Sequence, residues 1–182
     1  MFFVDYENLR YSPKHGFGCD PIDVSPIKLA QLVVSRRNVK SHVERVRVYR
    51  GIARADMNDP RASSDMARLE RWKRDVQVTP ITRPLQYSWR DGVRTSFEKG
   101  IDVALAVDLI RLAHSSADVD AIVVSRDSDL NPALEAFVES DCLGRRIEVV
   151  SVKKVERLRL WNSSKPWCHY LTREDFERIR ED

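Results

Sequence analysis

This sequence has few cysteines, no long apolar run and only a small net charge, and each of these features narrows the class of protein. The three cysteines lie far apart and form no CxxC pair, so we expect neither a disulfide framework nor a zinc site. No stretch approaches the ~20 apolar residues of a membrane helix, and Asp5 and Glu7 interrupt any apolar core of a signal peptide. We therefore expect a cytoplasmic protein with no membrane association.

The formal net charge is only +3, so the field of the whole molecule is a weak argument for a polyanionic partner. The distribution of charge matters more, because acids gathered in one cleft would leave the remaining surface more basic than the total implies. A chain of 182 residues can form a single domain that buries about two-thirds of its unfolded surface. The sequence contains no internal repeat, linker or low-complexity segment, which favours one domain.

Short apolar runs alternate with amphipathic patterns, as in the βαβ units of a parallel sheet. The apolar runs predict five strands, at residues 2–5, 43–52, 76–81, 121–125 and 147–152. Helical periodicity and capping residues predict helices at 26–38, 59–72, 101–113 and 131–139, and a last helix capped by Thr172. The segments after the first strand and from 83 to 99 are expected to be loops. The expected fold class is α/β, with a central, mostly parallel five-stranded sheet.

Four aspartates are placed to meet at one edge of this sheet. Asp5 ends the first strand, Asp102 opens an apolar helix, and Asp127 and Asp129 follow the buried strand 121–125. In an open α/β sheet the ligand crevice lies at the carboxyl ends of the strands, and Mg²⁺ or Mn²⁺ prefers oxygen ligands. Each aspartate alone could equally cap a helix or a turn. Together they predict metal-assisted attack on a phosphate ester.

Several neighbours could assist these aspartates. Asn8 is a candidate ligand for a substrate phosphate or a brace for Asp5, and Ser125 could hydrogen-bond a carboxylate or a metal-bound water. Lys99 could contact a phosphate. Weaker candidates are Glu7, Glu98 and Asp108. Asp108 lies about 240° around the helix from Asp102, so both cannot point into one site.

Aromatic and basic side chains alternate in the segment 83–99. Trp89, Arg90 and Arg94 are candidate RNA-binding residues there, because bases of single-stranded nucleic acid stack on aromatic rings while cations follow the backbone. The alternative is that Trp89 and Phe97 fill the core beneath a long loop.

Three segments resemble the motifs of NYN-domain proteins, which belong to the PIN-like nucleases. They are Val4-Asp5-Tyr6-Glu7-Asn8-Leu9, residues 99–108 and Ser125-Arg126-Asp127-Ser128-Asp129, in the order of the family. The resemblance covers residues 1–152 and implies a PIN-like three-layer α/β/α sandwich. Residues 153–182 lie outside the resemblance, and we expect them to form a C-terminal helical extension packed on the same domain. It also implies ribonuclease activity, with Mg²⁺ or Mn²⁺ held by Asp5, Asp102, Asp127 and Asp129. Arg126 departs from the usual glycine; it could contact the scissile phosphate or crowd the loop.

The function favoured by these patterns is endonucleolytic cleavage of single-stranded or looped RNA through an aspartate-bound cation. One alternative is a non-catalytic module that binds RNA or a protein partner through a vestigial acidic site. Another is a phosphatase of the haloacid-dehalogenase type, which needs an acid aspartate two residues after its nucleophile, where this chain has Glu7. Besides RNA, the candidate partners are a second copy of the chain and an inhibitory protein.

Overall fold

The computed structural model describes residues 1–141, 143–153, 155, 157–160 and 166–181. Its core is a six-stranded sheet in which all paired strands are parallel. In spatial order the strands are β3 (Val78–Pro84), β2 (Val46–Ile52), β1 (Phe2–Asp5), β6 (Ala121–Val124), β7 (Ile147–Val152) and β8 (Trp167–Leu171). The predicted α/β class is confirmed, whereas the predicted count of five strands is wrong.

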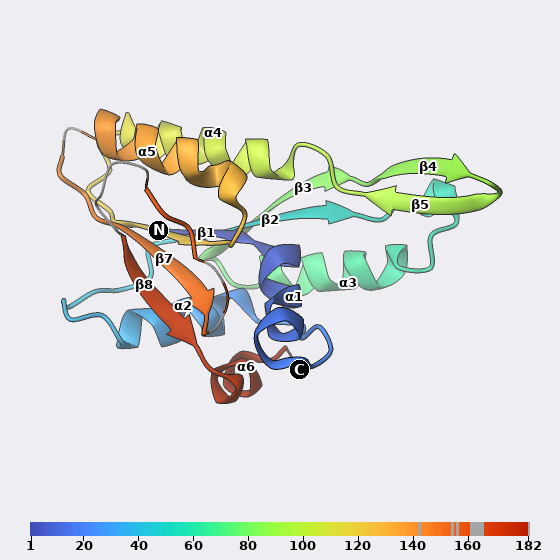
Figure 1. The fold of residues 1–182 in the computed structure, drawn as a ribbon, viewed down its shortest axis with the longest axis horizontal. Helices are drawn as coiled ribbons and strands as arrows, with labels where there is room; N and C mark the ends of the chain where they lie inside the picture. Colours follow the sequence, from blue (N-terminus) through green and yellow to red (C-terminus); the bar gives the residue numbers. More distant parts are fainter. Residues whose placement is uncertain (142, 154, 156, 161–165, 182) are drawn as a thin grey trace.

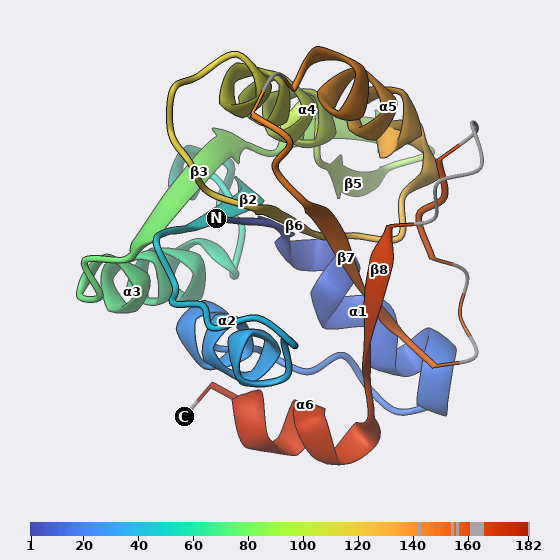
Figure 2. The same ribbon diagram turned by 90° about the vertical axis from the view of Figure 1, so that its left-hand side faces the viewer.

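Helices cover both faces of the sheet and give the predicted three layers (Figure 1). One face carries α4 (Ile101–Ala113) and α5 (Asn131–Ser140). The other carries α1 (Tyr6–Phe17), α2 (Pro26–Ser35) and α3 (Ala62–Lys73). The last helix, α6 (Arg173–Ile179), packs against α1 and α2 (Figure 2). No helix among the described residues has both the length and the apolar character to cross a bilayer.

The central strand β1 shows why its sequence is a continuous apolar run. Successive side chains of a strand point to opposite faces, and here both faces are covered. Phe2 and Val4 join the core beneath α1, α2 and α3, while Phe3 joins the core beneath α4 and α5. Phe3 and Val4 have no exposed surface. A strand buried on both faces cannot alternate apolar and polar residues.

The segment after β1, expected to be a loop, is helix α1. Asp5 caps its first turn by accepting a hydrogen bond from the backbone N–H of Asn8 (3.2 Å), and Gly18 ends it with φ 69°. Pro13 lies inside the helix, where the Ser12 hydroxyl donates to the Asn8 carbonyl oxygen (2.8 Å). The loop prediction gave weight to proline and glycine and overlooked the helix cap at Asp5.

The segment 83–99 is also not a loop. It holds an antiparallel hairpin of β4 (Gln86–Arg90) and β5 (Val93–Phe97). The turn is Asp91-Gly92, and both residues have positive φ, 51° and 75°, as the common two-residue hairpin turn requires. In Figure 1 this hairpin extends beyond the carboxyl ends of β2 and β3. The Asp-Gly pair between alternating side chains was the signal for it.

The sixth strand, β8, comes from the C-terminal segment and pairs with β7. The sequence did not predict this strand, because it is short and follows a polar segment that has neither helical nor strand periodicity. The helix cap predicted at Thr172 is confirmed, since its side chain accepts from the Asp175 N–H (3.3 Å) in a capping box. The proposed division at residue 152 remains a prediction, and residues 154, 156, 161–165 and 182 of the extension lie outside the described part of the chain.

The arrangement of β1 locates the ligand-binding edge. β1 pairs with β2 on one side and with β6 on the other, so the chain reverses its direction of winding between them, at the topological switch point.

Cys19 and Cys168 are free, and Cys142 lies outside the described residues.

Candidate active site

A chain of hydrogen bonds joins the ends of β1 and β6. Ser125, which follows β6 and is buried, donates from its hydroxyl to Oδ2 of Asp5 (3.0 Å). The same hydroxyl oxygen accepts a hydrogen bond from the backbone N–H of Asp127 (3.1 Å). Asp127 caps the short 3-10 helix η2 (Ser128–Leu130) by accepting from the Asp129 N–H (3.0 Å). Ser125 therefore fixes Asp5 and the Asp127 loop relative to each other.

Asn8 makes a second link across the same edge. Its Oδ1 accepts a hydrogen bond from the backbone N–H of Arg126 (3.0 Å). The non-glycine residues with positive φ in the described chain are Asn58 and Asp91, so the loop does not need glycine where this chain has Arg126. The Arg126 side chain is half-buried and its Nε has no hydrogen-bond partner among the described residues. Burial lowers the pKa of Arg126, while the charge of Asp5 acts in the opposite direction.

Asp5 is a buried carboxyl group with two other acidic side chains nearby. Its pKa is raised to about 6, mainly by burial and to a smaller extent by the charges of Asp127 and Glu7, against the lowering effect of the hydrogen bonds from Asn8 and Ser125. Asp5 and Asp127, which are distant in sequence, thus influence each other directly. The sequence prediction that these two carboxylates meet is consistent with this geometry.

Glu98, a weaker candidate from the sequence, belongs to the same group of acidic side chains. Its pKa is raised to about 7, mainly by burial and in smaller part by the charges of Asp5 and Glu7. Its Oε1 accepts from the backbone N–H of Gly51 on β2. A Cβ at Gly51 would lie 2.7 Å from the Glu98 Cγ, so this approach requires glycine. The sequence made Glu98 only a weaker candidate, because its hydrogen-bond partner comes from β2.

The other two predicted aspartates lie on the surface. Asp102 is exposed on the first turn of α4, and Asp129 is exposed on η2. The carboxylate of Asp102 makes no hydrogen bond or ion pair with another residue of the described chain. Within the described ranges, no group of three or more His, Cys, Asp or Glu side chains is arranged to hold a metal ion. Asp108 is buried elsewhere, accepting from the Tyr49 hydroxyl (2.9 Å).

The candidate RNA-binding residues fall into two kinds. Trp89 is 66% exposed and Phe97 is 49% exposed on the hairpin, so the alternative that they fill the core is wrong. Arg90 and Lys99 are exposed as well. Arg94 instead braces the hairpin: it donates to the carbonyl oxygen of Met57 and lies over the Tyr87 ring (5.6 Å).

Replacing Glu98 by glutamine is expected to stabilise the protein at pH 8 by about 1–2 kcal/mol, a value discounted for solvent screening. The native pKa of about 7 lies above the ordinary 4.5. The contribution of Glu98 to stability is therefore most favourable below pH 4.5 and is lost as pH rises through 7. The glutamine side chain carries no charge and does not lose stability in this way, so the variant should be no more stable than wild type at pH 4.5. Urea denaturation at pH 4.5 and pH 8 measures the difference in the free energy of unfolding.

The control for this prediction is Glu139→Gln. Glu139 is an exposed glutamate on α5, and its replacement should change stability by less than about 0.5 kcal/mol at either pH. A Glu98→Gln variant no more stable than wild type at pH 8 would contradict the assigned cost of the buried charge.

Comparison with known proteins identifies the family of the chain and a structure with a similar fold. The family model of the NYN domain matches residues 1–162. A solved structure of a protein of unknown function from Vibrio parahaemolyticus shares the fold, with a TM-score of 0.54 and 21% identity over 85% of this chain and 82% of that one. No curated protein matches the chain. Because the match spans nearly all of the described domain, this chain belongs to the NYN-domain family.

Proposed function

We propose that this protein is a metal-dependent endoribonuclease that cleaves single-stranded or looped RNA. Membership of the NYN family places it within the PIN-like nuclease superfamily. The observation that carries the finer proposal is the Asp5–Ser125–Asp127 linkage at the topological switch point, the part of an open α/β sheet that binds ligands.

The donor chemistry of this edge fits a hard divalent cation. Asp5 and Asp127 would hold it, and the exposed carboxylates of Asp102 and Asp129 would complete the oxygen ligands. The raised pKa of Asp5 reflects burial and repulsion that a cation offsets. When bound, Mg²⁺ or Mn²⁺ would lower the pKa of a water molecule and neutralise charge on the phosphate.

The residues of the chain itself prepare the site in three ways. Ser125 and Asn8 hold the Asp5 carboxylate and the loop 125–129 in fixed positions. The amino terminus of α1 lies at this edge, and a helix amino terminus attracts a phosphate. The guanidinium of Arg126 and the ammonium of Lys99 would contact the RNA backbone, while Trp89 and Arg90 on the hairpin would bind bases and phosphates of the flanking strand.

Asp127→Asn tests this proposal. We expect a loss of cleavage of about 100-fold or more, with Mn²⁺ or Mg²⁺ required by the wild type and EDTA abolishing its activity. The assay follows an end-labelled structured RNA, and circular dichroism checks the fold. The matched control is Asp118→Asn, at an exposed aspartate in the loop before β6, which should cut like wild type. Full-rate cleavage by a folded Asp127→Asn variant would place the reaction elsewhere.

The second candidate is a non-catalytic RNA- or partner-binding module. Arg126 favours it, because a guanidinium in the field of Asp5 can offset part of the charge that a cation would neutralise. If the protein binds RNA but does not cleave it in Mn²⁺, in Mg²⁺ or in EDTA, the result would support the non-catalytic module. The phosphatase alternative receives no support from the family match; release of phosphate from a small phosphomonoester would revive it.

A further inference from the structure

A buried arginine lies beside the candidate active site. Arg50 follows Tyr49 on β2, and Tyr49 pairs in register with Asp5 of β1. The Arg50 side chain is 8% exposed, and its guanidinium lies over the Tyr6 ring at 5.0 Å. A charge can be buried this deeply only where acidic groups offset the cost of removing it from water. The carboxyl groups around Arg50 therefore show where the protein places its own positive charge.

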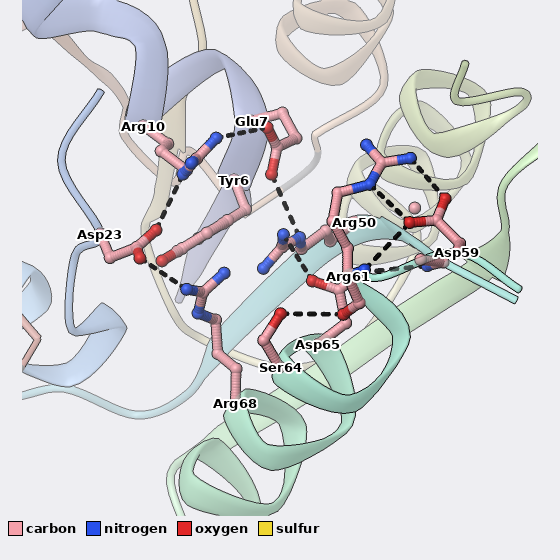
Figure 3. Close-up of polar contacts among 12 residues, drawn as sticks. Tyr6, Glu7, Arg10, Asp23, Arg50, Asp59, Arg61, Ser64, Asp65 and Arg68 are labelled. Atoms are coloured by element: carbon pink, nitrogen blue, oxygen red, sulfur yellow. Dashed lines mark hydrogen bonds and ion pairs between the residues drawn. The ribbon is translucent and has the colours of Figure 1, made fainter. Parts of the chain in front are cut away.

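Two carboxylates form ion pairs with Arg50 (Figure 3). Oε1 of Glu7 lies 3.1 Å from Nε of Arg50, and Oδ1 of Asp65 accepts a hydrogen bond from Nη2 at 2.9 Å. The second oxygen of Glu7 accepts from Nη1 of Arg10 at 3.3 Å. The second oxygen of Asp65 accepts from the backbone N–H of Ala53 at 3.0 Å. Each oxygen of both carboxylates thus has a contact already, and a metal ion would have to break one of these contacts to bind.

A third carboxyl group, that of Glu98, links Arg50 to the candidate active site. Glu98, Glu7 and Arg50 line one cleft between α1, α3 and the hairpin. Burial and the charges of Asp5 and Glu7 raise the pKa of Glu98. The charge of Arg50 acts to lower the same pKa. The Glu98 carboxyl group is therefore within reach of both charges, and the guanidinium offsets negative charge close to Asp5.

The carboxylates of Asp5 and Asp127 have no arginine or lysine partner among the described residues. Asp5 accepts hydrogen bonds from the Asn8 N–H at 3.2 Å and from the Ser125 hydroxyl at 3.0 Å. Asp127 accepts from the Asp129 N–H at 3.0 Å. Neither carboxylate forms an ion pair within the part of the chain that the structure describes. The charge of Asp5 and Asp127 is therefore left for a cation from solution, whereas the carboxylates of the cleft are neutralised by arginine.

We propose that Arg50 takes the place of a second divalent ion, so that the site binds one Mg²⁺ or Mn²⁺ and Glu7 is not a ligand. The inference rests on the proposed function for that ion, and it adds the number of ions and the reason for it. Sites with two metals hold the ions about 3.5–4 Å apart, so the carboxylates of both ions must lie close together. Glu7 is the carboxylate two residues after Asp5, and Arg50 and Arg10 hold it. Arg50 is thus a positioning residue that acts through Glu7.

The number of bound Mn²⁺ ions tests this inference. Electron paramagnetic resonance measures free Mn²⁺ while the ion is titrated into the full chain, and circular dichroism checks the fold. We expect one bound ion for wild type and two for Arg50→Gln, because Glu7 then lacks its buried cation. Arg50→Lys retains a positive charge and should bind one ion. The control Arg146→Gln, at an exposed arginine, should bind one ion as well.

Glu7→Gln is the second variant, and it covers the case in which Arg50→Gln does not fold. It should bind one ion like wild type, because Glu7 is not a ligand, whereas Asp127→Asn should bind none at the same Mn²⁺ concentrations. Two ions bound by wild type overturn the inference. A single ion bound by a folded Arg50→Gln variant overturns it as well, and so does loss of the ion from Glu7→Gln.

Cleavage of the end-labelled RNA by the same samples separates this inference from the proposed function. Two ions on wild type with metal-dependent cleavage overturn the role of Arg50 and leave the nuclease standing. One ion on wild type without any cleavage supports the role of Arg50 and contradicts the nuclease. A wild type that binds no Mn²⁺ overturns both.

Discussion

Asp5→Asn is expected to abolish RNA cleavage and, at pH 8, to make the protein more stable. The Asp5 carboxylate is charged at pH 8 at the cost of burial and of repulsion from Asp127 and Glu7. Asparagine has the same shape, caps a helix as well as aspartate, and carries no charge. We expect a gain of about 1–2 kcal/mol and a loss of cleavage of about 100-fold or more.

The gain in stability should depend on pH in a defined direction. The pKa of Asp5 is about 6 in the native state, against an ordinary 3.8, so the contribution of Asp5 to stability becomes less favourable as pH rises through this interval. The advantage of Asp5→Asn should therefore be full above pH 6 and absent below 3.8. Urea denaturation at pH 8 and pH 3.8 measures it, with Asp118→Asn as control. An asparagine variant less stable than wild type at pH 8 would mean that the carboxylate is needed for folding.

The features that sequence predicted well depend on local pattern. Helix α4 begins and ends at the predicted residues, 101 and 113, and strand β7 at 147 and 152, because each has a clear period or a continuous buried run. The proximity of Asp5 and Asp127 followed from one topological rule, that parallel strands bring their carboxyl ends to the same edge. The bridging hydroxyl of Ser125 was foreseen as a partner for a carboxylate.

The features that sequence missed depend on contacts between distant segments. Glu98 gains its raised pKa from burial against β2 and from the charges of Asp5 and Glu7. Strand β8 is stabilised by pairing with β7, and His169 within it contacts Glu148 at 2.7 Å. A surface cleft is lined by Arg10 of α1, Arg50 of β2 and Arg68 of α3, and these three segments share no sequence motif. Local periodicity carries no information about such pairings.

Arg145→Met is expected to destabilise the protein by about 3–5 kcal/mol, the largest stability change among these predictions. The Arg145 side chain is 1% exposed and pairs with Asp141 at 2.6 Å. It also donates to the carbonyl oxygens of Ala113 (2.7 Å) and Ala117 (2.8 Å). Methionine keeps much of the volume but leaves a buried carboxylate and these carbonyl groups unpaired.

Arg146 provides the matched control, because it is adjacent in sequence and exposed. Arg146→Met should change the free energy of unfolding by less than about 0.5 kcal/mol. Since Ala113 is the last residue of α4, Arg145 places a cation where the helix dipole favours one. Adding Asp141→Leu to Arg145→Met should recover part of the loss, since the unpaired charge is then removed. Equal losses in Arg145→Met and Arg146→Met would show that the buried ion pair contributes nothing, and that α4 is positioned by its apolar face alone.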